Sequence, residues 1–353
     1  MKIAMLLSGG VDSSVALRLL KEEGGHEITA FYLKIWLEDE MAFLGECPWE
    51  EDMQYVRAVC EELDIPLQVV PLQKEYMDRV VSYVLAELKQ GRTPSPDILC
   101  NERIKFGAFF DAIDESYDKV ATGHYAQVQE NEDGIFELLR APDPVKDQTY
   151  FLSSLSQAQL SRALFPIGSL MKSRVRELAE EYDLPNKVRK DSQGICFLGK
   201  ISYPDFVRFH LGEKQGDIIE IETDEKKGEH KGVWFHTIGQ RSGLGLSGGP
   251  WYVVKKDLES NIVYISHKNG LEDQLRDEVT VNTVHWTSGK FPQNTNLKVK
   301  LRHGPQLVEA RIMDLCEDRV FIKLEEKDKG IAPGQSCIFY DDLICLGRGV
   351  IEK

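Results

Sequence analysis

One cysteine lies where a reactive thiol would be useful. Cys100 ends the proline-rich run TPSPDILC that starts at residue 93, and two cations, Arg103 and Lys105, follow it. A helix start and nearby cations favour the thiolate, and Asp97, three residues before the cysteine, is suited to moving a proton to or from the sulfur. Cys100 is therefore a candidate nucleophile, although a buried structural cysteine fits this segment equally well.

A second cysteine, Cys196, lies in the segment KDSQGICFLG at residues 190–199, directly after Arg189. The glycines on either side of it leave the backbone accessible, and the neighbouring cations add positive charge, so this thiol could carry a sulfur atom. Because the two cysteines are far apart in the sequence, they can act together only if the fold brings both to one site.

A glycine-rich loop near the N-terminus has the features of an anion site. The string SGGVDSS at residues 8–14 separates a predicted strand from a predicted helix, where backbone N–H groups can hold phosphate. It lacks the lysine of a Walker loop, which favours pyrophosphate as the bound group. Asp12 could cap the helix or position Mg²⁺, and Ser13 and Ser14 can donate to phosphate oxygens. An ordinary glycine turn with a helix cap is the alternative interpretation.

The elements that must position these loops alternate in the N-terminal half of the chain. The patterns predict strands at residues 3–7, 28–33, 67–71 and 119–122, and helices at residues 13–23, 53–63, 76–88 and 105–113. Short buried strands separated by amphipathic helices predict a doubly wound parallel sheet of the α/β class, with its ligand beyond the carboxyl ends of the strands.

From about Tyr203 the hydrophobic pattern changes to alternation with period two. We expect a small, mostly β central domain with strands at 216–222, 233–237, 251–255 and 262–266, and a charged hairpin tip at 224–231. Antiparallel strands at 279–284, 297–301, 308–313, 320–324, 337–340 and 343–351 predict a C-terminal β-barrel. The expected domains are residues 1–202 (catalytic), 203–273 (central, RNA-binding) and 274–353 (barrel).

Composition limits the partners. The 353 residues include 43 Lys and Arg against 58 Asp and Glu, a formal net charge of −15, which argues against broad electrostatic capture of nucleic acid. An RNA partner would therefore need local basic groups; the candidates are Lys172, Arg174, Arg176, Lys187, Arg189, Lys190 and the loop at 237–241. No apolar run approaches the roughly 20 residues of a membrane helix. Seven cysteines without a CxxC pair indicate reduced thiols and argue against structural zinc.

Taken together, these strings resemble a known family. SGGVDSS is similar to the PP-loop of the N-type ATP pyrophosphatases. With GRTPSPDILCN, ATGHYA, KDQTYFL, KDSQGICF, HTIGQRSGLG, PWYVV, APGQS and CLGRG, essentially the whole chain resembles the tRNA-specific 2-thiouridylases. Those enzymes use ATP to replace the C2 oxygen of the wobble uridine with sulfur, releasing AMP and pyrophosphate. The chain departs from the common family pattern at Leu6, Gln193 and Arg348.

The resemblance implies a set of site residues. It makes Cys100 the catalytic nucleophile, Cys196 the persulfide carrier and Asp97 the acid/base, with a transient disulfide between the two cysteines. ATP would contact Leu6, Leu7, Ser8, Gly9, Gly10, Val11, Asp12, Ser13, Leu33 and Gly123. The target base would contact Ser95, Pro96 and Asp97, and the rest of the tRNA would contact Lys146, Asp147, Gln148, Arg302 and His303.

The resemblance also implies cofactors and partners. These are ATP with Mg²⁺, the anticodon arm of tRNA and an upstream persulfide donor, for a monomer that acts in the cytoplasm, or in a plastid or other organelle if a transit peptide has been removed. Two alternatives stay open. One is a PP-loop amidating ligase for a small substrate, which needs no thiol; the other is a non-enzymatic RNA-binding protein whose cysteines are core residues or zinc ligands.

Overall fold

The computed structural model describes residues 1–35, 49–191, 202–267, 275–316, 318–328 and 330–352. The predicted persulfide carrier, Cys196, lies outside these residues. No helix in the described ranges is long and apolar enough to cross a membrane.

A parallel sheet occupies the N-terminal part of the chain. Within the described residues its strand order is β3 (Leu67–Pro71), β2 (Glu27–Lys34), β1 (Lys2–Leu6), β4 (Lys119–Ala121), β7 (Ala163–Leu164). Successive strands are added to one side of β1 and then to the other, so the order reverses between β1 and β4. The carboxyl ends of those two strands therefore border the crevice in which such sheets bind ligands.

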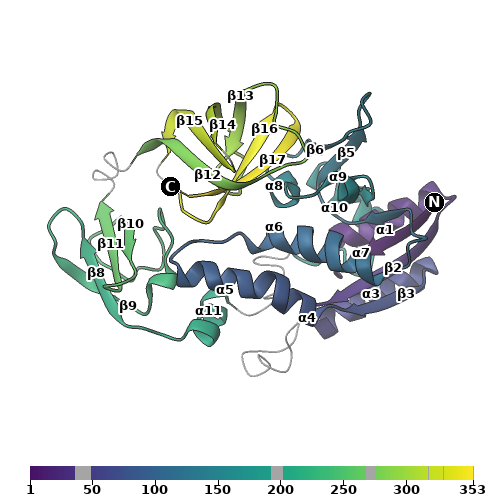
Figure 1. Cartoon of the computed structure of the whole chain (residues 1–353). Helices are drawn as coiled ribbons and strands as arrows, with labels where there is room; N and C mark the ends of the chain where they lie inside the picture. The colour runs from purple at the N-terminus through teal and green to yellow at the C-terminus, as the bar shows by residue number, and fades with distance from the viewer. Residues whose placement is uncertain (36–48, 192–201, 268–274, 317, 329, 353) are drawn as a thin grey trace.

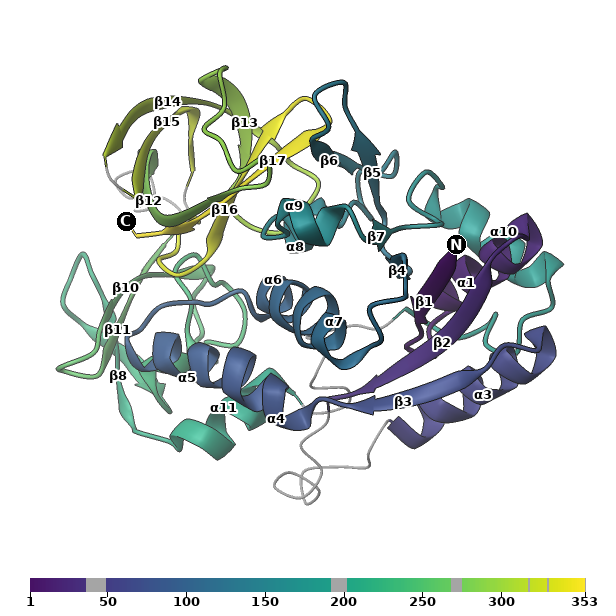
Figure 2. The same cartoon turned by 45° about the vertical axis from the view of Figure 1, so that its right-hand side comes forward.

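Helices cover both faces of the sheet because alternate strand residues point to opposite sides (Figure 2). Ile3 and Met5 share a core with α1 (Val11–Glu23), α3 (Trp49–Leu63) and α10 (Lys172–Glu181). Residues of the opposite face pack against a second set of helical segments that includes α5 (Ser82–Lys89), α6 (Pro96–Cys100) and α7 (Phe109–Ala112). The predicted doubly wound α/β sheet is confirmed.

Two helices of the second layer contain π-helical turns. The first runs through α4 (Gln73–Tyr76), a π-helical segment at Met77–Val81, and α5. The second starts at α6 and continues through a π-helical segment at Asn101–Ala108 into α7. The helix predicted to begin at residue 105 therefore begins nine residues earlier, at Pro96. Pro96 at the first turn supplies the start signal, because its fixed φ suits that position.

The central part is a sheet with the order β10 (Trp251–Asp257), β11 (Ile262–His267), β8 (Gly216–Glu220), β9 (Lys226–His230), preceded by α11 (Tyr203–Leu211). The charged run predicted as a hairpin tip is instead strand β9. It pairs antiparallel with β8, and Lys226 also reaches Asp217 of that strand at 2.8 Å. The strand predicted at 233–237 was also wrong; Val233–Phe235 forms a 3₁₀ turn.

The C-terminal part is a closed β-barrel, as predicted. Its strands are β12 (Arg276–Trp286), β13 (Asn296–Lys300), β14 (Val308–Cys316), β15 (Arg319–Asp328), β16 (Ser336–Asp341) and β17 (Ile344–Ile351), and pairing of β12 with β17 closes it. A hairpin of β5 (Ala126–Glu130) and β6 (Phe136–Arg140), which the sequence patterns did not predict, extends the barrel sheet through β17 (Figure 1). This hairpin therefore belongs to the barrel sheet, and the parallel N-terminal sheet remains a separate sheet.

Candidate active site

The glycine-rich loop joins β1 to α1 and leaves the helix N-terminus open. Gly10 is the N-cap residue and no side chain caps the helix. The Ser13 and Ser14 hydroxyls turn back to the Gly10 carbonyl at 3.0 and 3.1 Å. The Asn186 amide and the Arg189 guanidinium donate to the Gly9 carbonyl at 2.8 and 2.9 Å. These hydrogen bonds fix the loop through the Gly9 and Gly10 carbonyls, and the N-terminal end of α1 is available to an anion.

Gly123 lies against the start of α1, at the carboxyl end of β4. A Cβ on this residue would be only 2.7 Å from the Ser13 nitrogen and 2.9 Å from the Asp12 carbonyl carbon, so only glycine allows the approach. Leu33 is near the carboxyl end of β2, two strands from β4. His124 is buried, and its Nδ1 is 2.7 Å from the Thr122 hydroxyl, which indicates a structural role.

A Gly123→Ala variant tests this close approach. The added methyl group must push against backbone rather than against a flexible side chain, and overpacking of this kind costs about 1–3 kcal/mol. We expect ATP affinity to fall roughly tenfold to a hundredfold, as measured by equilibrium dialysis. Gly25→Ala is the control for backbone strain outside the site, because its φ of +71° strains an alanine while a Cβ there meets nothing within 4 Å. Unchanged ATP affinity in the Gly123 variant would contradict the placement of this residue in the nucleotide site.

Cations that the loop itself lacks reach it from elsewhere in the chain. Lys172, the first residue of α10, donates to Asp12 at 2.7 Å and lies 2.8 Å from Asp191. Lys146 binds Asp191 at 2.6 Å, and Arg176 binds the same carboxylate. Burial raises the pKa of Asp191, but the hydrogen bonds from Lys146 and Lys172 outweigh it and hold the pKa well below its usual range.

Asp12 has a different role from the predicted cap. Its carboxylate accepts from Lys172 and from the Tyr125 hydroxyl at 2.9 Å, and it does not cap α1. In the sequence, Lys172 is only one of several basic residues at helical spacing. Its proximity to the glycine-rich loop, 160 positions away, follows from the packing of α10 against α1 and has no local sequence signal.

Cys100 is the last residue of α6 and is buried, with 1% of its surface exposed. It belongs to the hydrophobic core that also contains Leu6 and Phe31 of the sheet. The π-helical turn that follows is fixed by Gln159, whose side-chain amide donates to the Glu102 and Phe106 carbonyls at 2.9 and 2.7 Å. π-Helical turns of this kind are frequent at functional sites. Asp97 lies one turn earlier on α6 and is half-buried.

Comparison with known proteins gives matches along most of the chain. Residues 1–200 match the family described as "tRNA methyl transferase HUP domain", residues 204–267 its PRC-barrel domain, and residues 276–351 the "aminomethyltransferase beta-barrel domain". A protein of Bacteroides thetaiotaomicron named tRNA-specific 2-thiouridylase MnmA 1 is 47% identical over 359 residues, covering 100% of both chains. A protein of Parabacteroides distasonis named tRNA-specific 2-thiouridylase MnmA is 45% identical over 99% of both.

The chain belongs to the tRNA-specific 2-thiouridylase family.

In this 2-thiouridylase the three residues of the KDQ motif have different surroundings. Lys146 is half-buried and forms an ion pair with Asp191 at 2.6 Å. Gln148 accepts from the Tyr125 backbone N–H at 2.9 Å. The Asp147 side chain is fully buried, 2.9 Å from Lys300 of the barrel, and accepts from the Thr149 hydroxyl at 2.8 Å. Asp147 therefore offers no exposed surface for the RNA contact expected from the resemblance, and in this structure it joins the N-terminal part to the barrel.

Two other candidate RNA contacts are exposed on the 2-thiouridylase barrel. Arg302 forms a bidentate pair with Asp328 at 2.9 and 2.8 Å. The His303 ring stacks on Phe151 with a centroid distance of 4.5 Å. Both side chains are accessible, so an RNA phosphate could compete with Asp328 for the guanidinium, and a base could approach the stacked rings.

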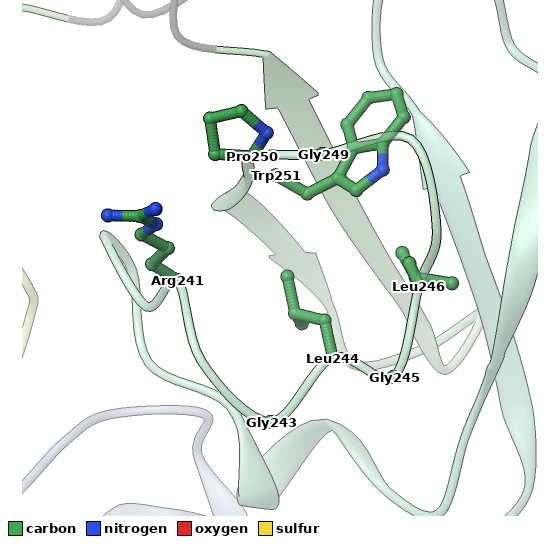
Figure 3. Close-up of a pocket in the computed structure, with 8 residues that line it drawn as sticks. All are labelled: Arg241, Gly243, Leu244, Gly245, Leu246, Gly249, Pro250 and Trp251. Atoms are coloured by element: carbon green, nitrogen blue, oxygen red, sulfur yellow. The ribbon is translucent and has the colours of Figure 1, made fainter.

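The central domain of the 2-thiouridylase contains a cavity of about 430 Å³ inside the loop that follows the HTIGQ segment (Figure 3). Leu244, Leu246 and Trp251 form its apolar lining and Arg241 supplies its charge; the other lining residues are Gly243, Gly245, Gly249 and Pro250. The lining includes no nucleophile, carboxylate or histidine. The cavity is therefore suited to binding rather than to catalysis, and it belongs to the part of the chain expected to contact RNA.

Proposed function

We propose that this protein is an ATP-dependent tRNA 2-thiouridylase that converts the wobble uridine of tRNA to 2-thiouridine. The observation that carries the proposal is its 47% identity, over its full length, to a protein with that name. The open helix N-terminus after β1 and the cysteine at the end of α6 supply the two chemical functions that such a reaction needs.

The first step activates the base. The uridine C2 oxygen attacks the α-phosphorus of ATP, an O–P bond forms, and pyrophosphate leaves with the bonding electron pair. The loop from Leu6 to Ser13 would hold the phosphates through backbone N–H groups, and Lys172 would compensate the charge that builds up on the leaving pyrophosphate. Leu33 and Gly123 would border the nucleotide at the carboxyl ends of their strands.

Mg²⁺ fits this site through Asp12. The Asp12 side chain is 30% exposed, and one carboxylate oxygen is a sufficient protein ligand for an ion whose other ligands are phosphate oxygens and water. When bound, Mg²⁺ would neutralise part of the pyrophosphate charge. Asp191 is a less suitable ligand because three cations already hold it.

The second step replaces oxygen with sulfur. The terminal sulfur of a Cys196 persulfide attacks C2, and AMP leaves with the former O2 atom. The Cys100 thiolate then attacks the Cys196 sulfur, a Cys100–Cys196 disulfide forms, and the sulfur remains on the base. In the alternative order, Cys100 first releases sulfide from the persulfide and the sulfide attacks C2. Asp97 would accept the Cys100 proton, and an external dithiol reduces the disulfide after either route.

The geometry that supports Cys196 as the sulfur carrier is its tether. Asp191 forms an ion pair with Lys172, and Lys172 binds Asp12 of the glycine-rich loop. Cys196 comes five residues after Asp191, and five residues of chain extend at most about 18 Å, which limits how far Cys196 can be from Asp191. The target base would reach Ser95, Pro96 and Asp97 after leaving the anticodon stack, while Lys146, Gln148, Arg302 and His303 would contact the RNA. We further propose an upstream persulfide protein as the sulfur source, a monomeric state and a cytoplasmic location.

The test is reconstitution. Purified protein, unmodified tRNA, ATP, Mg²⁺, a persulfide sulfur donor and a dithiol should yield 2-thiouridine, detected by nucleoside mass spectrometry. AMP and pyrophosphate, measured separately, should be equimolar with it. An amidating ligase would instead consume ATP with ammonia and a small acid, and a non-enzymatic RNA-binding protein would release no pyrophosphate. Absence of thiolated tRNA under all sulfur sources would overturn the proposal.

An Asp12→Ala variant should fail at the adenylation step. Loss of this carboxylate removes the partner of Lys172 and Tyr125 and the proposed Mg²⁺ ligand, so tRNA-dependent pyrophosphate release should fall on the order of a hundredfold. The loading of sulfur onto Cys196, measured by persulfide labelling, should stay unchanged. Normal pyrophosphate release with defective sulfur loading would contradict the assignment of Asp12 to the adenylation step.

A further inference from the structure

The loop that precedes α6 is held from two sides. We call residues 91–95 the strap, because this segment connects the end of α5 to Asp97 and Cys100. Figure 1 shows it passing between the central sheet and the barrel. The Thr93 backbone N–H donates to the Pro333 carbonyl of the barrel at 2.8 Å, and the Thr93 hydroxyl lies 3.2 Å from the Thr237 hydroxyl of the central domain.

Gly334 makes the barrel side of this contact possible. Its φ is +91°, and a Cβ there would be 2.8 Å from the Thr93 nitrogen and 2.7 Å from the Arg92 Cβ. The Gly334 N–H donates to the Ile351 carbonyl at 2.8 Å, which fixes the glycine to the last strand of the barrel. The barrel backbone therefore approaches the strap more closely than any side chain at position 334 would allow.

A second contact reinforces the first one. The Tyr150 hydroxyl donates to the Ser336 carbonyl of the barrel at 3.2 Å and also interacts with the Ser95 side chain. Pro94 and Pro96 flank Ser95, and their fixed φ angles leave the strap few ways to deform. A displacement of Thr93 would therefore be passed on to α6 instead of being absorbed within the loop.

We propose that Gly334 is a positioning residue for the thiolation reaction, acting through the strap on Asp97 and Cys100. The inference rests on the proposed function of those two residues. It means that the barrel supports the thiol in addition to any role in RNA binding, and that the N-terminal domain alone would hold Cys100 less accurately. A misplacement of about 1 Å at a reacting group lowers rates on the order of a hundredfold.

The experiment compares Gly334→Ala with Gly289→Ala in the full-length protein. Gly289 is also in the barrel and has a φ of +72°, but a Cβ there meets nothing within 4 Å, so it matches the backbone strain without the collision. For Gly334→Ala we expect kcat for thiolation to fall on the order of a hundredfold, with the KM for ATP changed less than about twofold. We also expect the buried Cys100 thiol to react at least about tenfold faster with iodoacetamide, read by peptide mass spectrometry. Gly289→Ala should match the wild type in all three measurements.

Tyr150→Phe is a second variant that removes the hydroxyl linking Ser336 to Ser95 while leaving the core packing in place. It should lower kcat and raise the Cys100 alkylation rate, as in Gly334→Ala, but by smaller factors. If Gly334→Ala does not fold, Tyr150→Phe alone tests the proposal. Wild-type kcat and alkylation in both variants, or equal losses in Gly289→Ala and Gly334→Ala, would overturn the proposal. The alkylation rates test the strap even if the wild-type protein makes no 2-thiouridine, so failure of the proposed function is distinguishable from failure of this inference.

Discussion

Replacing Cys196 or Cys100 with serine should lower 2-thiouridine formation by on the order of a thousandfold or more, because the hydroxyl oxygen can neither carry a sulfane sulfur nor open a persulfide. ATP binding should persist in both variants, since the glycine-rich loop and Gly123 are unchanged. Nucleoside mass spectrometry of tRNA after reaction measures the first effect, and equilibrium dialysis of ATP measures the second.

The two variants should differ in whether Cys196 carries persulfide sulfur. Cys196→Ser should take up no persulfide sulfur, whereas Cys100→Ser should load sulfur on Cys196 and retain it. In the wild-type protein, a single turnover without reductant should leave one Cys100–Cys196 disulfide for each 2-thiouridine formed, detectable by peptide mapping. Appreciable thiolated tRNA from either serine variant would contradict the assigned roles.

The remaining described cysteines provide controls. Burial, with a smaller contribution from Glu61, raises the pKa of Cys60 to about 11, and burial raises the pKa values of Cys337 and Cys345 still further, so these thiols are poor nucleophiles. Cys316 is exposed on the barrel. Cys316→Ser should therefore keep full activity, and it controls for the general effect of removing an accessible thiol.

Local patterns predicted the elements that carry the chemistry. The strand before the glycine-rich loop, expected at 3–7, is Lys2–Leu6, and the strand expected at 67–71 is Leu67–Pro71. Their signals are short apolar runs bounded by turn residues, which depend on near neighbours only. Barrel strands such as Arg319–Asp328 were predictable for a similar reason, because buried and exposed residues alternate along them.

Charged strands and cross-domain pairings were not predictable in this way. β9 has the composition of a solvated turn, and it is a strand because it pairs with β8. The β5–β6 hairpin joins the barrel through Leu138 and Cys345, residues of two segments expected to belong to different domains. Sequence periodicity describes which face of a segment is buried, but it does not describe which distant segment covers that face.

In the candidate site, too, local sequence signals are predictable and contacts between distant segments are not. The loop, Cys100 and Asp97 belong to recognisable strings, whereas the ion pairs at the loop and at the barrel contact join residues far apart in the chain. Lys172 and Asp12 are 160 positions apart, and Lys300 and Asp147 are 153 apart. A lysine on a polar helix and an aspartate in a turn are ordinary surface residues until the fold brings them together.

The Asp147–Lys300 pair allows the most demanding test of how the barrel and the N-terminal domain depend on each other. Both side chains are fully buried, and Arg140 approaches the same carboxylate at 3.3 Å. Burial raises the pKa of Asp147, but the Lys300 ammonium and the Thr149 hydrogen bonds outweigh it, so the pKa lies below its ordinary value. The pair therefore stabilises the fold at neutral pH, and its contribution is lost as the pH falls through that depressed pKa.

Removing Lys300 leaves the buried Asp147 carboxylate with Arg140 as its only charged partner among the described residues. Lys300→Met should lower the free energy of unfolding by about 3–5 kcal/mol, measured by urea denaturation of the full-length protein through the transition that includes the barrel. The double variant Lys300→Met with Asp147→Leu should recover much of this loss, because two apolar side chains need no charge compensation and only the partly exposed Arg140 loses a partner. Equal instability of the single and double variants would show that side-chain packing, and not the charge pair, determines the stability of this interface.

The same pair of variants separates a structural role of Asp147 from direct RNA recognition. If Asp147 acts by joining the barrel to the segment that positions Lys146 and Gln148, tRNA affinity should fall in Lys300→Met and return in the double variant together with stability. If the Asp147 carboxylate instead binds RNA, the double variant should be stable and still bind tRNA poorly. Because Asp147 has no exposed surface and Lys300 is 2.9 Å from its carboxylate, we expect tRNA affinity to follow stability, as filter binding at fixed salt will measure.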